Sequence, residues 1–226
     1  MKLFIDDAHI EKIKHIYEYY PVDGVTTNPS ILAKVGKNPL ETLHEIREFI
    51  GPEGIMFVQA VALTAEGMIN DAHMIVDLFG RNTIVKIPSI PEGFKAIREL
   101  KKDGIMTCGT VVYTPMQAYL AAKAGASYVA PYVNRIDNMG YDGIKVTKEI
   151  HDILVSNHMD HCQVLAASFK NSQQVLELAE YGVGSSTAAP DVIDTFVKNP
   201  AIDGAINDFV KDFEKLTGSR SMTGLE

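Results

Sequence analysis

Cysteine and tryptophan are scarce in this sequence: its 226 residues include two cysteines and no tryptophan. Cys108 and Cys162 lie in apolar segments and lack the CxxC spacing of metal and redox sites. Two isolated thiols exclude a disulfide framework of the kind that holds small secreted domains together. We therefore predict that both residues are reduced thiols in the core of the protein.

Long hydrophobic runs and an excess of positive charge are also absent. No apolar stretch approaches the roughly 18 residues that a membrane-spanning helix needs, and the start, MKLFIDDAHI, meets two aspartates too early for a signal peptide. The formal net charge is −8, which argues against a nucleic-acid groove or a site for an anionic membrane surface. We expect a cytoplasmic protein that holds any anionic ligand in a local cationic site.

Eight short runs rich in Val, Ile, Thr and aromatic residues alternate with amphipathic stretches. The runs cover residues 2–6, 24–28, 55–61, 83–88, 105–112, 128–133, 163–168 and 183–188. The stretches between them carry apolar stripes at helical spacing, for example Ile10, Ile13 and Ile16. Eight strands, eight helical connections and no linker predict the α/β class, with residues 1–226 folded as one (β/α)8 TIM barrel.

A further amphipathic helix is predicted at residues 201–217, where no ninth strand remains to be covered. Its apolar stripe consists of Ile202, Ala205, Ile206, Phe209, Val210, Phe213 and Leu216. Such a face either packs on the helices of its own barrel or docks on another subunit, because joint exposure of the two phenylalanines is unfavourable. We expect this additional C-terminal helix to take part in oligomer contacts.

Polar residues occur near the ends of most predicted strands, at the face where an α/β barrel builds its active site. They are Asp6, Thr26, Thr27, Asn28, Gln59, Lys86, Thr110, Tyr132, Asn134, Arg135, Ser168 and Lys170. Polar residues that merely decorate the surface do not explain why seven successive predicted strands end in polar side chains. The pattern predicts that these side chains converge at one mouth of the barrel.

Lys86 is the most informative of these residues. It lies in the apolar run TIVKIP (83–88), where an ammonium group is costly unless it is paired or neutralised. Its stem could line the wall while its head reaches solvent at the rim. Alternatively, it is a desolvated amine that attacks a carbonyl group and forms a Schiff base. Position alone leaves both interpretations open.

Asp6 and Tyr132 would place proton-transfer groups near that amine, and Gln59 and Thr110 could hold a water molecule there. Each residue also has a structural alternative. Asp6 could cap the helix that follows, and Tyr132 could be a packed ring with a bonded hydroxyl. A satisfied core amide and hydroxyl would account equally well for Gln59 and Thr110.

A phosphate site is predicted near strands seven and eight, where barrel enzymes often bind phosphate with helix N-terminal amides. Ser168 and Lys170 precede one predicted helix, and Ser185 and Ser186 precede another. Arg135, at the neighbouring strand end, could add a fork of donors. The sequence therefore predicts a phosphorylated ligand.

Four segments resemble the small transaldolase family: GVTTNPS (24–30), VKIP around Lys86, AGASYVAPYVNRID (124–137) and VLAASFKN (164–171). The resemblance implies that Lys86 forms a Schiff base with a dihydroxyacetone unit. It further implies that Asp6 and Asn28 contact the substrate's hydroxyls or the bond being broken, and that Arg135 and Ser168 bind its phosphate. Thr27 is also expected to bind the substrate.

Four positions separate the two branches of that family. Transaldolases carry Glu, Asn, Ser and Phe where this chain has Gln59, Thr110, Ala130 and Tyr132, and all four resemble the aldolase branch. Because Gln59 can orient a water molecule but cannot ionise, Tyr132 is implied as the proton donor and acceptor. The eighth strand, SSTAAPDV, departs from the bulkier aliphatic residues that family members usually carry there.

The expected function is that of a class I aldolase, a lyase that reversibly cleaves fructose 6-phosphate to dihydroxyacetone and glyceraldehyde 3-phosphate through an imine on Lys86. No metal or organic cofactor is expected, because the iminium itself is the electron sink. A transaldolase is the alternative, and a catalytically silent scaffold is a third possibility. The resemblance also suggests a homo-oligomer, either a pentamer or a decamer.

Overall fold

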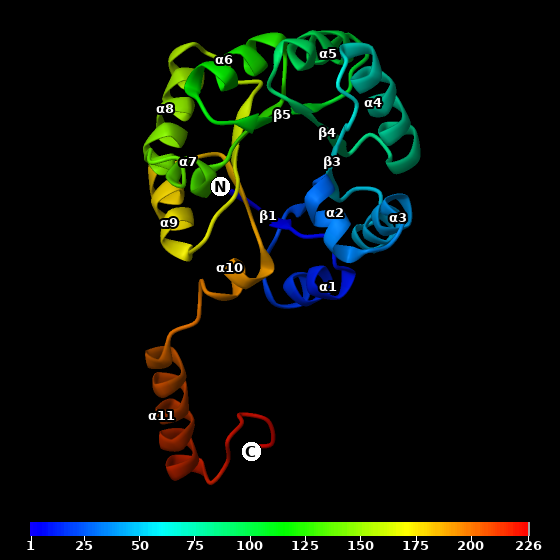
Figure 1. The fold of residues 1–226 in the computed structure, drawn as a ribbon. Helices are drawn as coiled ribbons and strands as arrows, with labels where there is room; N and C mark the ends of the chain where they lie inside the picture. The colour runs from blue at the N-terminus through cyan, green and yellow to red at the C-terminus, as the bar shows by residue number, and fades with distance from the viewer. Residues whose placement is uncertain (226) are drawn as a thin grey trace. The chain divides into compact units, whose positions relative to one another are not determined.

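The computed structural model describes residues 1–225, and eight parallel strands within them close into a barrel (Figure 1). The strands are β1 (Lys2–Asp6), β2 (Gly24–Thr26), β3 (Ile55–Gln59), β4 (Thr83–Pro88), β5 (Thr107–Val112), β6 (Tyr128–Pro131), β7 (Gln163–Ala166) and β8 (Ser185–Ala188). Each strand pairs with the next along the chain, and β8 pairs with β1. The predicted (β/α)8 barrel is confirmed.

The described residues also form eleven helices. They are α1 (Ile10–Tyr19), α2 (Pro29–Val35), α3 (Pro39–Ile50), α4 (Ala65–Phe79), α5 (Pro91–Lys102), α6 (Pro115–Ala124), α7 (Val133–Asp137), α8 (Gly143–Ser156), α9 (Ser172–Tyr181), α10 (Pro190–Asp194) and α11 (Pro200–Thr217). Figure 1 shows the longer barrel helices in an outer ring, with α2 and α7 nearer to the strands.

The short helices α2 and α7 were not predicted, because a single helix was expected in each connection. Asn28 and Pro29 explain α2: the Asn28 side chain accepts a hydrogen bond from the backbone of Ile31, and Pro29 occupies the first turn. The helix ends at Gly36, whose left-handed φ of 73° suits glycine. As a result, α2 begins directly at the end of β2, beside the mouth of the barrel.

Side chains alternate along each strand between the helices and the barrel interior. Outward residues such as Val25, Met56 and Val85 are fully buried beneath the helices. A separate cluster fills the interior and is called the inner apolar cluster here; it consists of Phe4, Phe57, Ile84, Cys108, Tyr128, Ala130 and Leu165. The Phe57 ring makes edge contacts at 5.2 Å between centroids with both Phe4 and Tyr128, so aromatic packing closes the lower part of the barrel.

Both cysteines are buried and unpaired, as predicted. Cys108 belongs to the inner apolar cluster, and Cys162 lies just before β7. Burial raises the pKa of each thiol to about 12.

The segment from Asp194 onward forms a compact unit of its own, separate from residues 1–193. Within it, Asn199 caps α11, Pro200 occupies the first turn, and Gly218 ends the helix with a φ of 74°. The helix thus covers the range predicted from the apolar stripe. Phe209 is 73% exposed and Leu216 is 82% exposed. Across the described part of the chain, we find no helix with the length and apolar character to cross a membrane.

Candidate active site

A polar layer lies directly above the inner apolar cluster. Each member lies two residues further along its strand than another residue that faces the barrel interior, so its own side chain also faces the interior. They are Asp6, Thr26, Gln59, Lys86, Thr110, Tyr132 and Thr187. The structure therefore brings together the five residues that were predicted to be catalytic.

Lys86 is enclosed, with only 4% of its surface exposed. Its Nζ donates a hydrogen bond to the backbone carbonyl oxygen of Thr27 at 2.9 Å. Gln59 is its register partner on the neighbouring strand β3. An amine held in this way does not reach bulk solvent at the rim, which favours the reactive interpretation of Lys86 over the snorkelling one.

Asp6 receives a hydrogen bond at Oδ1 from the Thr26 hydroxyl at 2.7 Å. The surrounding protein raises the pKa of the Asp6 carboxyl above its usual value, because burial disfavours the charged form. The charges of Lys86 and Arg135 and the bond from Thr26 oppose that rise without cancelling it. Asp6 is therefore a carboxyl group whose protonation responds to its immediate neighbours.

Tyr132 is held by three contacts. Its hydroxyl lies 2.8 Å from the Thr110 hydroxyl, and either oxygen can be the donor. The guanidinium carbon of Arg135 lies 4.6 Å from the centre of the Tyr132 ring, and the Tyr113 ring packs edge-on at 5.7 Å. These contacts fix the phenol at the polar layer.

Strand β5 is irregular where it supplies Thr110. Its register with β6 shifts between Gly109 and Val112, and Val111 has a left-handed φ of 59°, which is costly for a β-branched residue. Gln117 on α6 stabilises this segment: its Nε2 donates to the Val111 carbonyl at 3.2 Å, and its Oε1 accepts from the Tyr113 backbone at 3.0 Å. Sequence reasoning did not single out Gln117.

The predicted phosphate-binding residues Arg135 and Ser168 lie on α7 and on the segment after β7, and these two segments are tied together. The Asn134 backbone donates to the Ser168 carbonyl at 2.9 Å, and Val133 donates to Ala167 at the same distance. These bonds bring α7, which carries Arg135, to the segment after β7. Ser168 has a left-handed φ of 64°, a strained conformation of the kind that concentrates at functional sites.

Three other residues have roles that differ from the simplest expectation. The Thr27 hydroxyl donates to the Phe57 carbonyl, so this residue approaches Lys86 only through its backbone. Ser185 and Ser186 do not lie in a mouth loop: both are fully buried within β8, where Ser185 donates to the Val164 carbonyl and the Ser186 hydroxyl has no partner. The expected phosphate role for these two serines is therefore wrong.

Thr187 is a member of the polar layer that the sequence interpretation passed over. Its Oγ1 lies 2.6 Å from the Oγ1 of Thr26, and only 2% of its surface is exposed. Thr187 lies on the same inward-facing side of β8 as Ser185, and its contact with Thr26 joins residues that are far apart in the sequence.

Comparison with known proteins identifies a family and a fold. The sequence model of the family described as Transaldolase/Fructose-6-phosphate aldolase matches residues 3–223. A protein of Aquifex aeolicus (strain VF5) described as "Probable transaldolase" is 42% identical over 216 residues, covering 96% of this chain and 98% of that protein.

Two solved structures show the same fold at low identity. One, described as "Native KDPGal structure", has a TM-score of 0.56 and 16% identity, with 84% of each chain covered. The other, a doubly substituted flavocytochrome b2 with sulfite bound, has a TM-score of 0.60 and 13% identity. That match covers 84% of this chain and 56% of the flavocytochrome. At these identities, the similarity extends to the barrel alone.

Proposed function

Because the chain belongs to the transaldolase/fructose-6-phosphate aldolase family, we propose that it is a class I aldolase that cleaves fructose 6-phosphate to dihydroxyacetone and glyceraldehyde 3-phosphate. The family consists of Schiff-base enzymes that act on sugar phosphates. The observation that carries the proposal is the enclosed Lys86 amine, bound to the Thr27 carbonyl and ringed by the polar layer.

In the cleavage direction, the Lys86 amine adds to the ketose carbonyl and water leaves, which gives an iminium ion. The electrons of the C3–C4 bond then move into the iminium, the C4 hydroxyl loses its proton, and the aldehyde departs. Protonation of the remaining enamine at C3, followed by addition of water, releases dihydroxyacetone and restores Lys86. The iminium is the electron sink, so the scheme needs no metal or organic cofactor.

Tyr132 is the group through which we propose that the C4 proton passes. Its oxygen can accept that proton while its own hydrogen passes to a bound water, and that water supplies a proton to C3 of the enamine. The Thr110 hydroxyl, 2.8 Å away, holds the phenol oxygen in place. Gln59, next to Lys86 in the sheet register, can orient that water but cannot take up a proton. The proton therefore moves from the C4 hydroxyl through Tyr132 to the bound water, and not through Gln59.

The choice between the two branches depends on these same residues. Gln59, Thr110, Ala130 and Tyr132 resemble the residues of the aldolase branch, in which the three-carbon unit is released to water, and this supports the aldolase. If the unit instead remained on Lys86 until an aldose phosphate accepted it, the enzyme would be a transaldolase, the description given to the Aquifex aeolicus relative. That activity is the second candidate.

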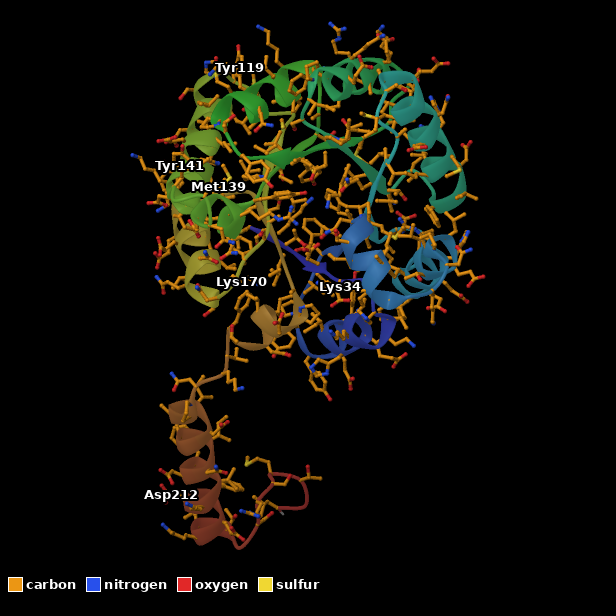
Figure 2. The ribbon with its side chains drawn as sticks, viewed as in Figure 1. Lys34, Tyr119, Met139, Tyr141, Lys170 and Asp212 are labelled. Carbon is orange, nitrogen blue, oxygen red and sulfur yellow. The ribbon has the colours of Figure 1, made fainter. Side chains whose placement is uncertain are left out.

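The phosphate of the substrate is proposed to lie between Arg135 on α7 and Ser168 after β7, which the backbone bonds of residues 133–134 to residues 167–168 tie together. Figure 2 labels the exposed Lys170, which follows Ser168 by two residues in the segment after β7. Its charge supports binding of an anion by a protein whose net charge is −8.

The proposal includes a cytoplasmic homo-oligomer, a pentamer or a decamer. The buried, unpaired Cys108 and Cys162 are typical of proteins of a reducing compartment. The exposed apolar stripe of α11 is the surface that we assign to subunit contacts.

Incubation with fructose 6-phosphate alone tests the reaction. Continuous release of free dihydroxyacetone and glyceraldehyde 3-phosphate would establish the aldolase, whereas release of one aldehyde per site, renewed only when an acceptor aldose is added, would establish the transaldolase. No release at all would favour the silent scaffold.

Reduction with borohydride in the presence of dihydroxyacetone tests the chemistry independently. We expect a stable adduct that peptide mass mapping places on Lys86, and no adduct in Lys86→Ala. Labelling of a different lysine would contradict the assignment.

A further inference from the structure

Three side chains from three strands form a hydrogen-bonded row across one side of the polar layer. Thr187 on β8 lies 2.6 Å from Thr26 on β2, and Thr26 lies 2.7 Å from Asp6 on β1. Thr26 is fully buried and Thr187 is 2% exposed. Bulk water therefore does not replace a lost partner for either hydroxyl.

The direction of these bonds follows from counting hydrogens. A threonine hydroxyl carries one hydrogen, and an ionised carboxylate can only accept. When Asp6 is ionised, Thr26 must donate its hydrogen to Asp6, so the hydrogen between the two threonines must come from Thr187. The row then runs from Thr187 to Thr26 to Asp6.

This direction has an electrostatic consequence. A hydroxyl that accepts a hydrogen bond becomes a stronger donor, because each bond in a row polarises the next. Thr187 thus strengthens the bond from Thr26 to Asp6 and favours the charged form of the carboxyl. It also fixes Oδ1 on the threonine side, and among residues 1–225 no hydrogen-bond donor reaches Oδ2.

We infer that Thr187 is a positioning residue of the active site, which acts through Thr26 to favour the ionised form of Asp6 and to leave Oδ2 free for the substrate. This inference rests on the proposed function for the part played by Asp6. The row itself stands on the geometry alone.

The other groups that act on Asp6 come from neighbouring elements. Lys86 on β4 and Arg135 on α7 favour its charged form, and Asp7, the next residue along the chain, opposes it. Burial is the largest effect and also opposes the charge. Thr187 therefore acts on a carboxyl group whose charge is only partly compensated, where one hydrogen bond changes the pKa measurably.

The test is the pKa of Asp6 in the full-length protein, measured by ¹³C NMR of labelled aspartate carboxyls and assigned with Asp6→Asn. In Thr187→Val, which keeps the shape but removes the hydroxyl, we expect the Asp6 pKa to rise by about 0.5 unit or more. Thr187→Ser restores the donor and should return the pKa to within about 0.2 unit of the wild-type value.

Ser186→Ala is the matched control. Ser186 is the preceding residue of β8 and points to the other face, and its buried hydroxyl has no partner. Its removal should leave the Asp6 pKa unchanged. Thr187→Ala provides a second deletion of the hydroxyl, without the branched side chain, if Thr187→Val does not fold.

Three results would overturn the inference: an unchanged Asp6 pKa in the variants that lack the hydroxyl, an equal shift in Ser186→Ala, or a Thr187→Ser protein that behaves like Thr187→Val. The acidic limb of the pH profile for fructose 6-phosphate cleavage should move with the NMR value. If cleavage or the Lys86 adduct is absent altogether, the proposed function fails, whereas the NMR titration still decides the role of Thr187.

Discussion

The guanidinium of Arg135 stacks on the ring of Tyr132, with 4.6 Å between its central carbon and the ring centre. One residue is proposed to bind the substrate phosphate and the other to move its proton. The contact fixes the distance between the group proposed to bind phosphate and the group proposed to transfer the proton, because the guanidinium packs directly on the ring. A ketose phosphate of the correct length would then place its reacting carbon at the phenol when its phosphate reaches the arginine.

Removal of the Tyr132 hydroxyl should slow the cleavage of fructose 6-phosphate. Tyr132→Phe keeps the ring contact with Arg135 but loses the bond to Thr110, and we expect kcat to fall about 100-fold, the usual effect of a positioned proton-transfer group. Tyr141→Phe, at a site that is 67% exposed, is the control and should retain wild-type kcat. A loss below fivefold in Tyr132→Phe would move the proton-transfer role to Asp6.

Substitution of Arg135 should discriminate between substrates. Arg135→Ala is expected to raise KM for glyceraldehyde 3-phosphate at least tenfold in the synthesis direction, while KM for unphosphorylated glyceraldehyde changes little. The substitution also removes a packing partner of the Tyr132 ring, so kcat should fall as well. The fall in kcat should be smaller than the rise in KM and about equal for the two aldehydes. Equal increases in KM for both substrates would show that Arg135 is structural.

Asp6 should make the stability of the protein depend on pH in a defined direction. Its pKa is raised in the folded protein, so the folded state still holds a proton at pH values where the unfolded chain has released it. The free energy of unfolding therefore falls as pH rises from about 4 through the folded-state pKa.

The difference in Tm between wild type and Asp6→Asn isolates this effect, since other groups titrate in both proteins. We expect wild type to lose about 2 °C or more relative to Asp6→Asn as pH rises from 4 to 7. The opposite trend would mean that the pKa of Asp6 is lowered by its cationic neighbours.

The two cysteines should be inert in the native protein. Burial raises the pKa of Cys108 and Cys162 to about 12, so almost no thiolate is present at pH 8. A disulfide reagent such as DTNB should titrate no thiol in native protein and two per chain in guanidinium chloride. Rapid reaction of either thiol under native conditions would contradict the burial described above.

The apolar stripe of α11 should control the assembly. Truncation before Ala201, or Phe209→Glu in the full chain, is expected to reduce the mass measured by light scattering, because we propose that burial of this face stabilises subunit contacts. Lys211→Ala, which changes a charged residue of the same helix, is the control. If both altered proteins keep the full assembly mass, the barrel helices hold the oligomer.

The sequence predicted the barrel well because its evidence is local: alternation along each strand and apolar stripes on each helix. It also placed Lys86, Asp6 and Tyr132 at one mouth, since parallel strands end on the same side. How far a residue lies below the mouth of the barrel, however, depends on the register of its strand with the neighbouring strands. For this reason Ser185 and Ser186 were assigned to the mouth although they lie in the wall.

The same limit explains why Thr187 and Gln117 were missed. Thr187 is defined by its contact with Thr26, a residue far away in the sequence, and no periodicity records that contact. Gln117 lies in a regular helix, and its role appears only with the irregular β5 segment and the left-handed Val111 that it supports. Long-range contacts of this kind are decided by packing of the whole barrel.

The spacing between the two interior layers separates the parts of this protein that can change independently. On β3, β4 and β5, Phe57, Ile84 and Cys108 fill the closed lower barrel, and two positions later Gln59, Lys86 and Thr110 belong to the polar layer, where we propose that the substrate binds. Substitutions in the upper set can therefore alter substrate range while the lower set continues to hold the strands together. A library of variants limited to the upper positions should stay folded more often than a library of equal size limited to the lower positions. The substrate specificity of this barrel can therefore change without an initial loss of stability.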